Sequence, residues 1–249
     1  MISVKTPEEI EIIVEGGKIL ATVMKKLQEL AKPGITTREL DRAAEAFVLS
    51  MGAKPAFKGY DSFPYSLCAS LNENIVHGFP SDYALKNGDL LKLDFGVLYK
   101  GYNTDMAITV AVGNVSFETK RLIDVAKKSL RLGIKKAKIG NTIGDIGNTV
   151  QRFVEGQGFS VVRDLCGHGI GKNLHEEPKV PNFGKRQSGE KLVEGMVIAI
   201  EPMVTMGSYN LRKSNDGYGY ATKDNSLSAH FEHTIAITKK GPRILTENN

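Results

Sequence analysis

Two aspartates flank the stretch DFGVLYKGYNTD, residues 94–105, and could do chemistry together. Apolar residues on both sides of a KG dipeptide predict a β-hairpin. With a two-residue loop at Tyr99 and Lys100, Asp94 lies directly opposite Asp105, and both side chains point to the same face. Opposed carboxylates repel each other, because their Cβ atoms lie about 4.5–5.5 Å apart. A shared cation would account for the arrangement; the alternative is a different register, with both carboxylates in water.

Two glutamates occupy a similar context later in the chain. The strand-like segment LVEGMVIAIE ends at Glu201 and resembles LKNGDLLKLD, which ends at Asp94. Glu232 precedes the apolar run HTIAIT, just as Asp105 precedes MAITVAV. The chain therefore offers two pairs of acids, each pair on predicted strands.

The elements that must position these acids also occur twice. Residues 32–52 align without gaps with residues 138–158, and each segment follows a long predicted amphipathic helix and contains a second one. The identical pairs are Lys32/Lys138, Gly34/Gly140, Thr36/Thr142, Phe47/Phe153, Val48/Val154 and Gly52/Gly158. Chance similarity between helices is the alternative, but the matching strands downstream favour a duplication. We expect an α+β fold, a single domain 1–249 made of two α/β halves, approximately 1–113 and 114–249, related by a pseudo-twofold axis.

A pseudo-twofold arrangement would bring all four acids to the seam between the halves. Four clustered carboxylates repel strongly in a low dielectric, and only protonation or multivalent cations relieve that repulsion. His168 lies between glycines in GHGIG, where its ring is unscreened. The four acids and this imidazole can hold two divalent ions if Asp105 and Glu232 bridge them. An oxygen-rich shell favours Mn, Fe or Co over a structural zinc site.

A pair of such ions predicts a hydrolase. Two ions about 3.5–4 Å apart share a water and lower its pKa, so that hydroxide is available near neutral pH. Amide hydrolysis needs that hydroxide, a Lewis acid for the carbonyl, a proton relay and an oxyanion stabiliser. Cys68 and Cys166 are not predicted to be nucleophiles, because neither has a general base at a sequence spacing that would indicate a catalytic pair.

Composition places these residues in an ordinary globular protein. The chain has 249 residues, 41% of them hydrophobic and 24% charged, which suits one large core or two joined halves. No apolar run is long enough to span a membrane, and the start MISVKTPEEIEII lacks the pattern of a secretory signal. Two cysteines make no disulfide framework, which favours the cytoplasm. The net charge of +5 permits a polyanionic partner.

Five motifs together resemble the type I methionine aminopeptidases, over nearly the whole chain. They are HGFP, the 94–105 hairpin, GHGIGKNLHEEP, EGMVIAIEPM and SAHFEHT, in the order and approximate spacing of that family. The resemblance implies the pita-bread fold and a two-metal site. It places the metal ligands at Asp94, Asp105, His168, Glu201 and Glu232.

The resemblance also implies catalytic and substrate-binding residues. Glu201 would relay protons, His77 would approach the scissile amide nitrogen, and His175 would hydrogen-bond the substrate carbonyl. A methionine pocket would be lined by Phe57, Tyr60, Phe63, Cys68, Leu174 and Tyr218. This chain departs from the family pattern at Asn103-Thr104, where a His-small pair is usual, and at His230, where glutamine is common. Leu174 replaces an aromatic residue and Tyr218 a tryptophan.

We therefore expect a cytoplasmic, monomeric metalloexopeptidase that removes the N-terminal methionine of new proteins and prefers a small second residue. Its metals would be Co, Mn or Fe, with Zn or Ni as alternatives. Two alternatives compete with this function: an enzyme that cleaves X-Pro peptides, and a non-catalytic relative that binds RNA or ribosomes. A weak ribosome association is expected from Arg212, Lys213 and Lys223, in a segment that is glycine-rich and polar and predicts an exposed loop.

Overall fold

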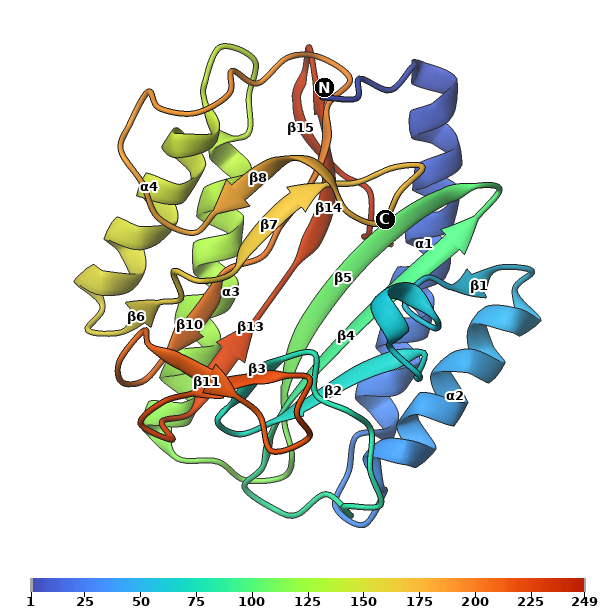
Figure 1. The fold of residues 1–249 in the computed structure, drawn as a ribbon, viewed down its shortest axis with the longest axis vertical. Coiled ribbons are helices and arrows are strands. Elements are labelled where there is room, and N and C mark those ends of the chain that lie inside the picture. Colours follow the sequence, from blue (N-terminus) through green and yellow to red (C-terminus); the bar gives the residue numbers. More distant parts are fainter. Residues whose placement is uncertain (1, 249) are drawn as a thin grey trace.

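Four α-helices and a set of short sheets make up residues 2–248, the part of the chain that the computed structural model describes. The helices are α1 (Pro7–Leu30), α2 (Thr37–Ser50), α3 (Phe117–Lys136) and α4 (Ile143–Gly156), with a 3-10 turn at Tyr60–Ser62. Figure 1 shows α1 and α2 on one side of the molecule and α3 and α4 on the other, with strands between them. None of the helices in residues 2–248 is long and apolar enough to cross a membrane.

The first half of the chain forms a four-stranded sheet in the order β1-β4-β2, with β5 also pairing with β4. The second half forms a five-stranded sheet in the order β15-β14-β9-β7-β8, and a three-stranded one in the order β13-β10-β6. A last sheet, β11-β12-β3, joins strands from both halves. The strands are β1 (Lys54–Pro55), β2 (Leu67–Leu71), β3 (Asn74–Val76), β4 (Leu90–Tyr99), β5 (Tyr102–Ala111), β6 (Ser160–Val161), β7 (Cys166–Gly169), β8 (Glu176–Pro181), β9 (Val197–Ile200), β10 (Met203–Thr205), β11 (Leu211–Lys213), β12 (Tyr220–Thr222), β13 (Ser228–His230), β14 (His233–Thr238) and β15 (Gly241–Ile244).

The sequence repeat is a repeat of structure. Helices α2 and α4 both have 14 residues, and α4 begins and ends 106 positions after α2. Both begin with a capping box, formed by Thr36 with Glu39 and by Thr142 with Asp145. These matched ends account for the threonine that the two segments share and for the acid three residues after it, and the predicted α+β architecture is confirmed.

The shared glycines of the repeat also have a local reason. Gly34 and Gly140 precede the two capped helices with φ values of 100° and 89°, a region that glycine enters without strain. The Gly34 N–H donates to Leu85 O at 2.8 Å, and the Gly140 N–H donates to Leu192 O at 3.3 Å. Each turn is thereby tied to the segment that leads into an acid-bearing strand.

The hairpin of β4 and β5 has a different register from the predicted one. Its turn is at Lys100 and Gly101, with φ values of 47° and 83°, and Tyr99 pairs with Tyr102. Asp94 therefore pairs with Ala107 and is diagonal to Asp105, not directly opposite it. A tight two-residue turn of this kind needs positive φ at both central residues, which glycine accepts and an aromatic residue resists. The shift is by two residues, so both acids keep the same face, as predicted.

Two apolar cores lie mainly one in each half, and Leu90 of β4 belongs to the core of the second half. In the first, α1 and α2 pack their buried leucines and valines against β2, β4 and β5. In the second, α3 and α4 pack against β9, β13 and β14. A third cluster joins the start of α1 to Val197, Ala236 and Leu245 of the second half. This cluster packs the two halves against each other.

We predict that Gly17→Ala destabilises the protein, because α1 touches the backbone just after β15 there. A Cβ at Gly17 would lie 2.0 Å from Leu245 O. The backbone of Leu245 cannot move away easily, because its N–H is hydrogen-bonded to Thr234 O. Overpacking of this kind costs about 1–3 kcal/mol of unfolding free energy. The matched control is Gly156→Ala at the end of α4, where a Cβ meets nothing within 4 Å. Thermal unfolding that is equal for the two variants would contradict the prediction.

Candidate metal centre

The predicted acids converge from both halves of the chain. Asp94 and Asp105 project from β4 and β5, Glu201 directly follows β9, and Glu232 directly precedes β14. All four are largely or fully buried. Separate segments of the chain, about 140 residues apart at the extremes, thus supply one cluster.

Three hydrogen bonds between β5 and the start of β14 hold the halves in register beside the acids. The Thr234 hydroxyl accepts from the Asp105 N–H and donates to the Asp105 carbonyl, both at 2.9 Å. The Glu232 N–H donates to Ala107 O, also at 2.9 Å. The backbones that carry Asp105 and Glu232 are therefore fixed relative to each other, which fixes where their carboxylates can reach.

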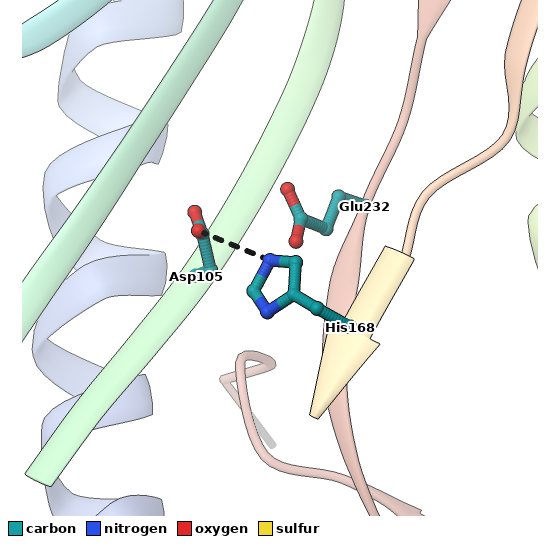
Figure 2. A group of neighbouring side chains, drawn as sticks. All are labelled: Asp105, His168 and Glu232. Atoms are coloured by element: carbon teal, nitrogen blue, oxygen red, sulfur yellow. Dashed lines mark ion pairs between the residues drawn. The ribbon is translucent and has the colours of Figure 1, made fainter. Parts of the chain in front are cut away.

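His168 faces the carboxylates with a free lone pair. Its Nδ1 lies 2.9 Å from Gly169 O, and a carbonyl only accepts, so Nδ1 carries the proton. Its Nε2 lies 4.0 Å from Asp105 Oδ2 and 3.8 Å from Glu201 Oε1. Figure 2 shows His168, Asp105 and Glu232 pointing toward one another. One ligand atom from each of the three lies within 4.8 Å of the other two. These distances are too long for direct hydrogen bonds but suit a cation with bonds of about 2.0–2.2 Å to each atom.

The electrostatics of the cluster also fit a cation. Burial raises the pKa of Asp94 to about 7 and that of Glu201 to about 8. Burial and the neighbouring carboxylates raise the pKa of Asp105 and of Glu232 well above the usual range. Among the described residues, Asp94 Oδ1 and Glu232 Oε1 are buried with no hydrogen-bond partner. Buried polar atoms without partners are costly, and divalent ions would satisfy them.

A cavity of about 590 Å³ opens onto this cluster. Its wall includes every residue that the sequence assigned to the site, which the structure thus brings together: Phe57, Tyr60, Phe63, Cys68, His77, Asp94, Asp105, His168, Leu174, His175, Glu201, Tyr218 and Glu232. Aromatic and sulfur-containing residues occupy one part of the wall, and carboxylates and imidazoles occupy another. A side chain and a polar backbone could be bound at once.

Two histidines flank the cluster in neutral form. Burial lowers the pKa of His77 to about 4 and also lowers that of His175. The His175 Nδ1 lies 2.8 Å from the Tyr60 hydroxyl, and its ring packs edge-on against His168 with centroids 4.4 Å apart. His77 has a φ of 60°, which is uncommon outside glycine and is strained. Both rings can donate a hydrogen bond at neutral pH.

His230 belongs to the same cluster, although its sequence context predicted no role for it. Its Nε2 lies 3.3 Å from Glu201 Oε2, and its backbone N–H and carbonyl both bond the Thr109 hydroxyl. The ring is fully buried, and neither nitrogen has a well-aligned hydrogen-bond partner. With Glu201 and Glu232 it forms a second group of ligand atoms within 4.8 Å of one another. The signal in the sequence was its departure from the glutamine of the family pattern.

The basic segment of the second half is more structured than predicted. The sequence predicted an exposed loop, but Leu211–Lys213 and Tyr220–Thr222 form strands that extend the sheet of β3. Lys213 donates to Tyr218 O at 3.0 Å, and both side chains line the cavity. The exposed-loop prediction is therefore wrong for this part, because pairing with β3 outweighs the local turn composition.

Comparison with known proteins agrees with the class that the fold and the site define, a metal-dependent peptidase. Residues 11–239 match metallopeptidase family M24, and the chain belongs to this family. A methionine aminopeptidase of Clostridium perfringens is 50% identical over 246 residues, 99% of each chain. A structure of a methionine aminopeptidase from Thermotoga maritima covers all of both chains with 40% identity and a TM-score of 0.98. The expected pita-bread fold is confirmed.

A second class of enzyme shares the fold. A structure of the prolidase from Pyrococcus furiosus has a TM-score of 0.80 and 26% identity to this chain. The match covers 99% of this chain and 66% of the prolidase. The shared architecture therefore does not by itself choose between the two substrate classes.

The raised pKa values set the sign of the pH dependence of the metal-free protein. A carboxyl whose pKa is raised on folding destabilises the fold as pH rises from its unfolded value to its folded one. For Asp94 and Glu201 those windows are 3.8 to about 7 and 4.5 to about 8. Burial lowers the pKa values of His77 and His168 below the unfolded value of 6.5, so these histidines destabilise the fold only below pH 6.5. Burial lowers the pKa of Lys92 to about 7, so above that pH this lysine makes the fold more stable as pH rises. It releases only one proton, whereas several buried carboxyls act in the opposite direction, so the net change is still a loss of stability.

We predict that the metal-free protein loses stability between pH 6.5 and 8, and that saturating Mn²⁺ removes most of this loss. Denaturant unfolding at several pH values measures it. Glu232→Gln should make the slope of the metal-free protein shallower, because it removes one buried carboxyl. The control is Asp82→Asn on the surface, where Arg38 lowers the pKa of the carboxyl out of this window. A metal-free protein whose stability is flat or rises over the window would contradict the prediction.

Proposed function

We propose that this chain is a methionine aminopeptidase, which hydrolyses the N-terminal methionine from new polypeptides. The main support for this proposal is the cavity, in which the carboxylate–histidine cluster faces an aromatic, sulfur-containing wall. Its relatives from Clostridium perfringens and Bacillus subtilis, 50% and 46% identical over 99% of their lengths, bear that name. The 113/114 connection lies between β5 and α3, and we take residues 1–113 and 114–249 as the two halves of one catalytic domain.

The residues that would hold two divalent ions are Asp94, Asp105, His168, Glu201 and Glu232, with Asp105 and Glu232 shared between the ions. Oxygen ligands with one imidazole suit Mn, Fe or Co, with Zn and Ni as weaker candidates. Such ions, when bound, make a hydroxide nucleophile available near neutral pH and polarise the scissile carbonyl. The unpaired oxygens of Asp94 and Glu232 support this assignment.

The proton transfers would fall to Glu201. Its carboxylate lines the cavity beside the other proposed ligands, where it could take a proton and pass it on. Its position between His168 and His230 places one carboxylate oxygen toward each ring.

The two neutral histidines would bind the scissile amide. When the Tyr60 hydroxyl donates to His175 Nδ1, the proton of the ring is on Nε2, which can donate to the substrate carbonyl as it becomes an oxyanion. His77 would approach the amide nitrogen from the other side of the cavity. Neither ring carries a charge at neutral pH, because burial lowers both pKa values.

The methionine side chain would lie against Phe57, Tyr60, Phe63, Cys68, Leu174 and Tyr218. Phe63 and Tyr218 pack at 5.5 Å between ring centroids, and Tyr218 stacks on Phe79 at 5.0 Å. Aromatic rings and sulfur suit an unbranched thioether. The Tyr218 hydroxyl donates to Asp61 O, so this ring is held where the family pattern has a tryptophan.

We predict that the Mn²⁺-loaded protein releases methionine from Met-Ala-Ser and leaves Ala-Pro-Ser intact. Met-Leu-Ser should be cleaved more slowly, because a small second residue is expected to fit best. The control is Glu232→Gln, which should abolish release while the protein stays folded. Cleavage of Ala-Pro-Ser in preference to Met-Ala-Ser would identify an X-Pro enzyme instead. No cleavage of either peptide, with metal bound, would favour a non-catalytic binding protein.

We further propose that the protein works in the cytoplasm as a monomer and meets its substrates at the ribosome. The net charge of +5 supports attraction to RNA phosphate. Arg212 and Lys223 are basic groups on the β11–β12 hairpin beside the cavity. Arg212→Glu with Lys223→Glu should weaken co-sedimentation with ribosomes, more at low salt than at high salt, and leave peptide cleavage unchanged. Lys213 stays unaltered, because it lines the cavity. Equal co-sedimentation at low salt would exclude this hairpin as the contact.

A further inference from the structure

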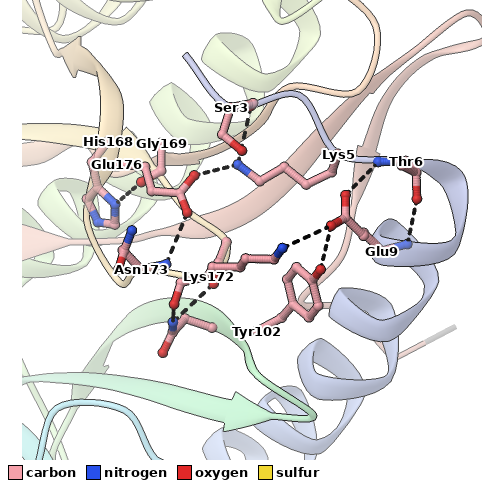
Figure 3. Close-up of polar contacts among 12 residues, drawn as sticks. Ser3, Lys5, Thr6, Glu9, Tyr102, His168, Gly169, Lys172, Asn173 and Glu176 are labelled. Carbon is pink, nitrogen blue, oxygen red and sulfur yellow. Dashed lines mark hydrogen bonds and ion pairs between the residues drawn. The ribbon is translucent and has the colours of Figure 1, made fainter. Parts of the chain in front are cut away.

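A buried ion pair links the start of the chain to the residue after His175. Lys5 Nζ lies 2.6 Å from Glu176 Oε2, and the two side chains are only 3% and 10% exposed. Figure 3 shows the Lys5 side chain reaching from the segment before α1 to Glu176, with a further bond to Ser3 O. Neither residue of the pair is part of the wall of the 590 Å³ cavity, and Glu176 lines an adjoining pocket beside His175.

The other oxygen of Glu176 holds the loop that precedes it. Glu176 Oε1 accepts from the Asn173 N–H at 3.0 Å, and the Gly171 N–H donates to Asn173 O at 3.1 Å. From the opposite side, Asn103 Nδ2 donates to Gly171 O and Lys172 O, at 3.0 and 3.1 Å. The loop 171–175 is therefore fixed between β5 and the Lys5–Glu176 pair.

Lys5 is itself fixed, so it can fix the loop. Its N–H donates to Gly195 O at 2.8 Å, and Val4 bridges to Met196 just before β9. Its side chain packs closely on the loop, since a Cβ on Gly171 would lie 2.5 Å from Lys5 Cε. Gly195 and Met196 lead directly into the strand that ends next to Glu201. Lys5 thus ties the loop to the segment that positions the cluster.

The loop carries two residues of the cavity side by side. Leu174 and His175 both line the cavity, and the His175 ring packs against His168. A displacement of the loop would move both of them relative to the cluster. A misplacement of about 1 Å can cost about 10²-fold in rate.

We propose that Lys5 and Glu176 are positioning residues, which set His175 and Leu174 against the metal centre. This inference rests on the proposed function, because its kinetic test measures the cleavage of a methionine peptide. The pair acts through His175 on kcat and through Leu174 on KM, without touching the substrate. The affinity for metal is not affected, because none of the proposed ligands lies on the loop.

The kinetic test is a double-mutant cycle of Lys5→Met and His175→Ala on Met-Ala-Ser. We expect Lys5→Met to lower kcat/KM about 10- to 100-fold, with Mn²⁺ affinity by calorimetry within about twofold of wild type. In the His175→Ala background the same change should lower kcat less than about twofold, because the group it positions is gone. A merely structural role would give the full loss in both backgrounds and would overturn the proposal.

The matched control is Lys239→Met, which removes a lysine from an exposed pair with Glu194. It should change neither kcat nor KM. If Lys5→Met leaves too little folded protein, Lys5→Met with Glu176→Gln removes both buried charges and keeps an acceptor for Asn173. That double variant should fold and still show the kcat loss. Wild-type kinetics in the double variant would overturn the proposal.

A readout independent of activity separates this proposal from the proposed function. The ring resonances of His175 in the NMR spectrum should shift in Lys5→Met, while those of His77, on another segment, stay in place. If wild-type protein fails to cleave Met-Ala-Ser but the His175 shift occurs, the proposed function is wrong and the positioning stands. Unchanged His175 resonances would overturn the positioning whatever the peptide assay gives.

Discussion

Four buried carboxylates at the seam of two halves are the constraint on which the rest of this structure depends. Burial and mutual repulsion raise the pKa values within the group. Among residues 2–248, Lys213 is the only lysine or arginine in the wall of the cavity next to them. The fold therefore holds an electrostatic cost that only protons or cations remove. The hydrogen bonds between β5 and β14 keep the acids together despite that cost.

The duplicated architecture is what lets the fold tolerate such a cluster. Two apolar cores, each of two helices packed mainly against strands of one half, supply stability away from the seam. The acids lie on or next to strands from both cores. A single half would present two acids to solvent, whereas the pair encloses four. The same enclosure keeps His77, His168 and His230 neutral by lowering their pKa values, which suits ligation and hydrogen-bond donation.

The cavity combines this rigid centre with a loop held from outside. His168 is on a strand, but Leu174 and His175 are on the loop that follows it. That loop obtains its order from Asn103, Glu176 and Lys5, which lie outside the cavity. Chemistry that needs sub-ångström placement thus depends on a contact made by the first residues of the chain.

Local signals in the sequence determined much of the fold. The amphipathic helices of the repeated segments and the alternation that puts Asp94 and Asp105 on one face are patterns of neighbouring residues, so they can be read without a structure. The residue types of the site were also readable, because acids that a duplicated fold gathers at one seam repel one another unless protons or cations lie between them. Tertiary structure decided the rest: the diagonal register of the acids, the pairing of the β11–β12 hairpin with β3, the burial of His230 against Glu201, and the joining of Lys5 to Glu176 across 171 positions. Such contacts depend on which surfaces the whole chain buries, and no local pattern specifies that.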